Sequence, residues 1–259
     1  MCAGALFSCQ EKFLEKPDTT GTTTIESTFA NRAGAEQAMS AAYLSVLAHG
    51  LYPDGGLSNG VLPGISGENS YGESWMSLTQ FITAGFTAQP YESNGAQSPD
   101  NFFTNFSTIR RCYIVLEHVD LAADMSAEEK EVMKAEMKAL IAYRYMGMFI
   151  RYGGVPIVTK SLTTNDDLNI PRASLQETLD FIIKNADEAA AVLPDSWDAK
   201  YNGRFTKGAA MAIKARALLY AARPLFNSAT PYLAADDNKL ICFGAADAGR
   251  WQQVIAVNV

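Results

Sequence analysis

The chain has 259 residues, of which 48% are hydrophobic and 19% are charged, so it is long enough to bury a sizeable core in one large domain or two small ones. Its formal net charge of −7 excludes typical nucleic-acid-binding proteins, which need clustered lysine and arginine side chains to displace counterions. The sequence lacks an apolar run of about eighteen residues, and it therefore predicts no membrane-spanning helix.

The N-terminus is a short apolar run that ends at a cysteine. Cys9 follows Ala3-Gly-Ala-Leu-Phe-Ser8 and precedes polar residues, which is typical of a lipobox with cleavage before Cys9. The basic region of a signal peptide is missing, but a start upstream of Met1 would supply it. The alternative is an apolar start with an incidental cysteine. We expect lipidation of Cys9, which would anchor the chain to a membrane without spanning it.

Residues 10–28 are polar and rich in threonine, and they predict a tether or an irregular edge segment. The helical spacing of Ala35, Ala38, Met39, Ala42 and Tyr43 predicts a helix over residues 29–47. The helical spacing then stops, and it does not resume before residue 99.

Residues 51–99 mix glycine, proline, serine and asparagine with aromatic residues and lack helical periodicity. An irregular segment of this length is usually functional or disordered, and its aromatic content favours function. Aromatic rings stack on the apolar face of a sugar, while amides and carboxylates bind its hydroxyl groups. For Trp75 and Phe81 the alternative role, anchoring a short helix to the core, remains open. The predicted ligand contacts are Asn69, Tyr71, Glu73, Trp75, Tyr91 and Asn94.

Two helical hairpins follow, predicted over residues 103–124 with 128–152 and over residues 175–193 with 207–223. Ser126-Ala-Glu-Glu129 and Ser174-Leu-Gln-Glu177 are capping boxes, and Thr206 is a cap. Gly153, Gly154 and Pro156 end the longest helix. A further helix begins near Ala248. We predict a mainly α fold of stacked, tetratricopeptide-like hairpins with long irregular loops, little β structure and an incomplete C-terminus.

Catalysis has one candidate. Gly56-Leu-Ser58-Asn-Gly60 matches the G-x-S-x-G sequence of hydrolase nucleophile elbows, and Ser58, Asp100 and His118 follow one another in an order that suits a triad. A nucleophile elbow needs a buried strand before the serine, whereas glycine and proline surround Ser58. We favour a glycine-rich loop, and we expect His49 and His118 to have helix-end and helix-face roles.

The remaining candidates for metal binding or charge interactions are acidic residues and two cysteines. Asp166 and Asp167, with Asn165 and Asn169, have oxygen ligands suited to calcium, although a solvated turn is the favoured interpretation. Cys112 and Cys242 lack metal-ligand spacing and are expected to be small buried residues. We expect four helix-solvating or dipole-pairing acids, Glu128, Glu129, Glu131 and Glu136.

Six tracts occur in an order that is more specific than any one of them: Cys9-Gln-Glu-Lys-Phe-Leu14 with Lys16-Pro17, Ile109-Arg-Arg-Cys112, residues 136–156 with Arg151-Tyr-Gly-Gly-Val-Pro156, Pro171-Arg-Ala-Ser174, Gly203-Arg-Phe-Thr-Lys-Gly208, and Ala215-Arg-Ala-Leu-Leu-Tyr220. Together they resemble the SusD/RagB family, the surface lipoproteins that bind nutrients for outer-membrane uptake in Bacteroidetes-type bacteria.

The resemblance implies a tetratricopeptide-like scaffold, a lipidated Cys9 and a SusC-like TonB-dependent transporter as partner. It divides the chain into a signal-peptide remnant (1–9), a tether (10–28) and an incomplete SusD-like N-terminal domain (29–259). We predict a cofactor-free, non-enzymatic outer-membrane lipoprotein that binds an oligosaccharide or another nutrient at the cell surface. The alternatives are a helical-repeat adaptor that binds another protein and a serine hydrolase using Ser58.

Overall fold

The computed structural model describes residues 24–48, 67–68, 102–233 and 239–257, and within these ranges it contains helices and no strands. The predicted mainly α fold is confirmed. The elements are α1 (Ile25–Thr28), α2 (Arg32–Ala48), α5 (Phe102–His118), α6 (Ala127–Tyr152), α7 (Leu175–Ala190), α8 (Lys207–Ala222), α9 (Gly249–Val257) and two short 3₁₀ turns, η2 (Val119–Leu121) and η3 (Ala199–Tyr201).

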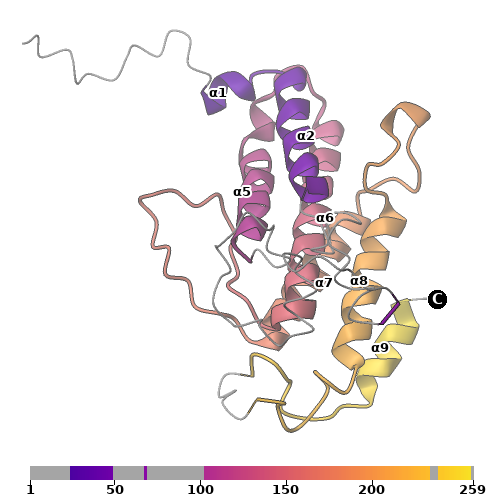
Figure 1. Cartoon of the computed structure of the whole chain (residues 1–259). Helices are drawn as coiled ribbons and strands as arrows, with labels where there is room; N and C mark the ends of the chain where they lie inside the picture. The colour runs from indigo at the N-terminus through magenta and orange to yellow at the C-terminus, as the bar shows by residue number, and fades with distance from the viewer. Residues whose placement is uncertain (1–23, 49–66, 69–101, 234–238, 258–259) are drawn as a thin grey trace, which may run out of the picture.

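The longest helix, α6, forms the centre of the bundle. It packs against α2, α5, α7 and α8, and α9 packs against α8 (Figure 1). Tyr145, Phe149, Leu140 and Met133 of α6 are at most 2% exposed, so these large side chains are buried. Because helices cover α6 on several sides, its large side chains supply much of the core.

Local hydrogen bonds explain the helix starts. The capping boxes at Ser126 and Ser174 both form, and the Thr206 hydroxyl accepts the Ala209 N–H. The one-turn helix α1 lies within the segment expected to be irregular, and it is capped in the same way by Thr24. There Ser27 replaces the usual Glu or Gln as the side chain that reaches back.

Two predicted helix ends differ from the structure by a few residues. α5 ends at His118, where the chain tightens into η2 before Ala122. α7 ends at Ala190, and the N–H groups of Val192 and Leu193 still bond to the Ala189 carbonyl. This last turn loosens ahead of Pro194, because proline disfavours a helical residue before it.

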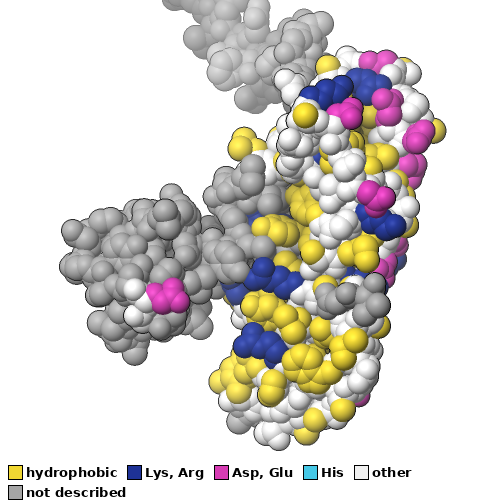
Figure 2. All heavy atoms as spheres, turned by 90° about the vertical axis from the view of Figure 1, so that its right-hand side faces the viewer, with side chains coloured by type: hydrophobic (Ala, Val, Ile, Leu, Met, Phe, Trp, Pro, Cys, Tyr) yellow, Lys and Arg dark blue, Asp and Glu magenta, His cyan; other side chains and the backbone are white. Residues whose placement is uncertain are grey.

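The outer side of α8 and α9 carries exposed apolar side chains: Met211, Leu219, Trp251 and Ile255. α8 contains no acidic residue. In Figure 2, hydrophobic and basic side chains occupy the lower part of this face, whereas acidic side chains lie mostly along its upper and right margins. None of the helices in the described ranges has the length and apolar character of a membrane span.

Candidate functional site

The six predicted ligand contacts, Asn69, Tyr71, Glu73, Trp75, Tyr91 and Asn94, lie outside the residues that the structure describes. The same is true of Cys9, His49, Ser58, Phe81 and Asp100. The structure instead describes the helices on either side of this segment. These helices, α2 and α5, are the described elements to which the segment is joined.

α2 and α5 run antiparallel. At one end, the Arg32 N–H donates to Asp124 Oδ1 at 2.6 Å, and further along the pair Arg111 Nη1 donates to the Ala41 carbonyl at 3.4 Å. The last turn of α2 and the first turn of α5 therefore lie at the same end of this helix pair (Figure 1). Ala48 and Phe102, the described residues on either side of positions 49–101, belong to these two turns.

Guanidinium groups bind the C-terminal end of α2. Arg144, which is 4% exposed, donates from Nη2 to the Ser45 carbonyl at 2.7 Å. Burial lowers the pKa of Arg144. Carbonyl groups at a helix C-terminus carry the negative end of the helix dipole and need donors. Arg144 therefore satisfies a carbonyl group in the last turn of α2, a role that we did not predict from the sequence.

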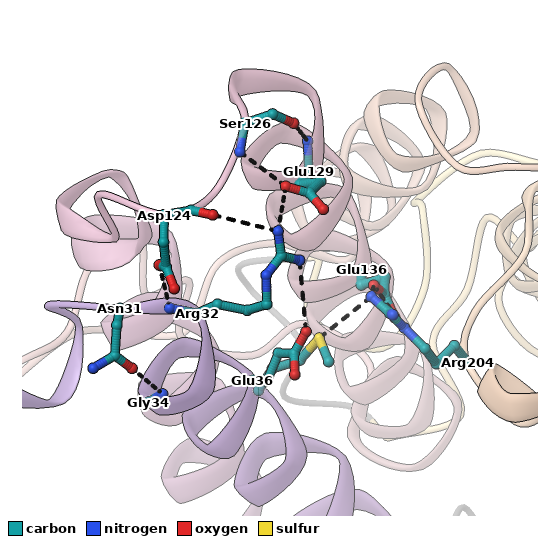
Figure 3. Close-up of polar contacts among 10 residues, drawn as sticks. Asn31, Arg32, Gly34, Glu36, Asp124, Ser126, Glu129, Glu136 and Arg204 are labelled. Atoms are coloured by element: carbon teal, nitrogen blue, oxygen red, sulfur yellow. Dashed lines mark hydrogen bonds and ion pairs between the residues drawn. The ribbon is translucent and has the colours of Figure 1, made fainter.

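Glu136 is the centre of a buried polar network, and our interpretation of it as a helix-solvating acid is wrong. Its side chain is completely buried. The Arg204 guanidinium binds both carboxylate oxygens, with Nε at 3.1 and 2.9 Å and Nη2 against Oε1 (Figure 3). The Tyr43 hydroxyl donates to Oε2 at 2.5 Å. A buried carboxylate needs such partners, because losing water without them is costly.

The network joins three distant parts of the chain. Tyr43 comes from α2, Glu136 from α6, and Arg204 from the connection between α7 and α8. The Tyr43 hydroxyl also accepts the Phe205 N–H at 3.0 Å. Burial, followed by the Glu136 carboxylate, raises the pKa of Tyr43, so the phenol stays protonated and donates. The Arg204 guanidinium also lies 4.1 Å from the Trp197 ring centroid, a cation–π distance.

One sequence signal marks the buried position of Glu136. Met133 and Leu140 lie three residues before it and four after it on the helix, and both are buried. Such spacing puts all three side chains on one face. By contrast, Glu129 is the dipole partner that we expected: it forms the capping box with Ser126 and an ion pair with Arg32 at 2.7 Å (Figure 3).

The Arg151–Pro156 and Pro171–Ser174 tracts meet at the end of α6. Gly153 has a φ of +76°, and a Cβ there would lie 2.1 Å from the Leu240 carbonyl oxygen. Arg172 donates from Nε to the Gly154 carbonyl at 2.7 Å and from Nη2 to the Tyr152 carbonyl at 2.6 Å. These contacts satisfy carbonyls at the end of α6 and leave no room for a side chain at Gly153, so both tracts have structural roles.

The Asp166 carboxylate is used within its own turn. It accepts the Thr163 N–H and hydroxyl, each at 2.8 Å, and pairs with Lys160. Lys160 is the main cause that lowers the pKa of Asp166 to about 2. Asp167 accepts the Asn169 N–H at 2.9 Å. Across the described ranges, no three His, Cys, Asp or Glu side chains are arranged to hold a metal ion.

His118 is the last residue of α5, in agreement with the helix-end and helix-face roles that we predicted for the histidines. Its Nδ1 lies 2.9 Å from the Ile114 carbonyl oxygen, and its ring lies 5.7 Å from that of Phe29. Cys112 and Cys242 are buried, unpaired thiols, as expected. Burial raises the pKa of Cys112 to about 12, which makes it a structural rather than a reactive thiol.

A SusD-like family model, described as starch-binding and associating with the outer membrane, matches residues 32–219. The chain belongs to this SusD-like family. A curated SusD-like protein from Formosa agariphila is 36% identical over 86 residues, which are 33% of this chain and 16% of that protein. The resemblance seen in the sequence is thereby confirmed.

Solved SusD-like structures share the fold. A SusD-like protein from Bacteroides fragilis is 27% identical with a TM-score of 0.61, and the match covers 76% of this chain and 36% of that one. A laminarin-binding SusD-like protein is 20% identical with a TM-score of 0.62, and the match covers 74% of this chain and 41% of that one. The SusD-like chain thus spans less than half the length of these relatives.

Proposed function

We propose that this SusD-like chain acts in a non-enzymatic surface lipoprotein that binds an oligosaccharide and delivers it to a SusC-like TonB-dependent transporter in the outer membrane. The family match over residues 32–219, with its starch-binding and outer-membrane description, is the observation that carries the proposal. The laminarin-binding relative with the same fold favours a glycan over other nutrients.

The proposed ligand contacts are the aromatic and amide side chains between α2 and α5. Tyr71, Trp75 and Tyr91 offer rings for stacking, while Asn69, Glu73 and Asn94 offer hydrogen-bonding groups. Binding of this kind needs no covalent step. α2 and α5, the helices that flank this segment, both pack against α6, and Arg144 of α6 bonds to the last turn of α2.

Binding is tested by calorimetric titration of soluble starch oligosaccharides and laminarin oligosaccharides into the 259-residue chain. Tyr71→Ala and Trp75→Ala should each weaken binding by at least about tenfold. Matched controls are Tyr232→Ala and Trp251→Ala, which remove rings that are 59% and 43% exposed in other parts of the chain. Unchanged affinity in both loop variants would remove Tyr71 and Trp75 from the site.

The non-enzymatic character is tested by incubating the chain with ester and glycoside substrates. We expect no turnover. Hydrolysis of an ester that disappears in Ser58→Ala would favour the hydrolase alternative instead.

The membrane anchor is tested at Cys9 in cells that express the protein from its genomic reading frame. Mass spectrometry should find a lipid on Cys9, and Cys9→Ser should release the protein from the outer-membrane fraction. Crosslinking in the same cells should capture a TonB-dependent transporter. Retention of Cys9→Ser in the membrane fraction would show that the lipid at Cys9 is not the anchor.

A further inference from the structure

α2 is held to the bundle in a different way from α6. Among residues 32–45, the part of α2 whose side chains the structure describes, the buried apolar side chains are Ala35, Met39 and Ala42, two of which are alanines. Leu44 is 65% exposed. Because the hydrophobic contribution grows with the apolar area removed from water, residues 32–45 of α2 gain little stability from apolar burial compared with α6.

Polar contacts supply much of the remaining attachment of α2. At its N-terminal end the Arg32–Glu129 ion pair has side chains that are 37% and 43% exposed, and exposed ion pairs contribute little. At its C-terminal half the Tyr43 hydroxyl contacts a carboxylate that is completely buried. Hydrogen bonds to buried charged groups are the stronger kind. The buried Arg144 guanidinium adds a bond to the Ser45 carbonyl at 2.7 Å, so Tyr43 supplies the side chain, and Ser45 the backbone group, through which this half of α2 binds buried charged groups.

We propose that α2 opens from the bundle as a separate unit and that Tyr43 is the latch that keeps it docked. Elements with few buried apolar contacts open at lower free energy than the core, and α2 fits that description. The Glu136–Arg204 pair joins α6 to the connection between α7 and α8, so opening α2 breaks none of the hydrogen bonds within this pair. α2 ends at Ala48, directly before the segment in the sequence that carries the proposed ligand contacts.

The test is native-state hydrogen exchange on the whole chain, with and without low concentrations of denaturant. In the wild type, α2 amides should exchange through an opening that exposes less surface than the opening of α6. The exchange of α2 amides should therefore depend less steeply on denaturant concentration. Tyr43→Phe keeps the ring and the Glu136–Arg204 pair but loses the hydroxyl. It should lower protection in α2 by roughly ten- to hundredfold and leave α6 and α8 unchanged.

Tyr145→Phe is the matched control. The buried Tyr145 hydroxyl accepts the Val158 N–H at 2.8 Å and donates to the Pro156 carbonyl at 3.2 Å, so its loss should affect residues 155–158 and not α2. Equal protection of α2 and α6 in the wild type would overturn the proposal. A Tyr43→Phe variant with unchanged protection in α2 would also overturn it, because Tyr43 would then not hold α2 in place. A variant that loses protection in all helices together, or that fails to fold, would overturn it too, because Tyr43 would then belong to the global core.

Discussion

The Glu136–Arg204 pair places a formal charge where no water can reach it. Glu136 is completely buried, while the Arg204 side chain is 19% exposed and lies against Trp197. Removing one partner of such a pair leaves the other as an uncompensated buried charge, which is more costly than losing the contact itself. The pair therefore favours the one packing arrangement in which Arg204 reaches Glu136.

Arg204→Met should lower the free energy of unfolding by about 3–5 kcal/mol in urea denaturation followed by circular dichroism. Adding Glu136→Gln to this variant should recover part of the loss. The control is Lys214→Met, which removes an ion pair with the half-exposed Asp187 and should cost less than about 1 kcal/mol. Equal effects of Arg204→Met and Lys214→Met would contradict the buried-pair account.

Gly153 gives a second test at the residue scale. With φ at +76° and the Leu240 carbonyl oxygen 2.1 Å from a built Cβ, Gly153→Ala should destabilise the fold by about 2–4 kcal/mol. Gly208→Ala is the matched control. Its Cβ meets only the Thr206 hydroxyl at 3.9 Å inside α8, so this change should be neutral or stabilising by up to about 1 kcal/mol. Comparable melting temperatures for the two variants would refute the steric explanation.

At the scale of elements, an ion pair between Arg32 and Glu129 joins α2 to the N-terminus of α6. The pKa of Glu129 is lowered from 4.5 to about 2, mainly by the hydrogen bond from the Arg32 guanidinium and next by the hydrogen bond from the Ser126 N–H. A carboxyl whose pKa is lower in the folded state stabilises that state above its unfolded pKa. This stabilisation is small, because both side chains of the pair are more than a third exposed, and it is lost as the pH falls from about 4.5 toward 2.

Glu129→Gln should therefore remove part of the acid dependence of stability between about pH 5 and pH 2, measured by urea denaturation across this range. The control is Glu128→Gln, a change at the exposed neighbour in the same first turn. It should keep the full acid dependence. If Glu129→Gln retained the wild-type slope, the Arg32–Glu129 pair would not contribute to folding.

The elements also show which signals in the sequence were sufficient. Capping boxes act within four residues, so Ser126 and Ser174 located the starts of α6 and α7 correctly. The role of Glu136 depends on Tyr43 and Arg204, which lie 93 and 68 residues away. Helical spacing placed Glu136 on a helix but contained no information about the distant partners that allow it to be buried.

At the scale of the whole molecule, scaffold and proposed site come from different parts of the chain. The family tracts at residues 151–156, 171–174 and 203–208 end helices, cap them or pair with Glu136. The proposed contacts belong to a segment whose aromatic content identified it, but no periodicity or local hydrogen-bonding motif specifies which side chains converge. Convergence depends on tertiary contacts that single-sequence spacing does not encode.

Separation of scaffold and site is the central claim, and glycan titration combined with thermal melting of the same samples tests it most directly. Tyr71→Ala and Trp75→Ala should lose affinity for the starch or laminarin oligosaccharides by at least about tenfold while keeping the wild-type melting temperature. Arg204→Met should melt earlier and, measured below its transition, bind as the wild type does. Wild-type affinity in both loop variants, or a lost affinity that always accompanies a lowered melting temperature, would contradict the claim.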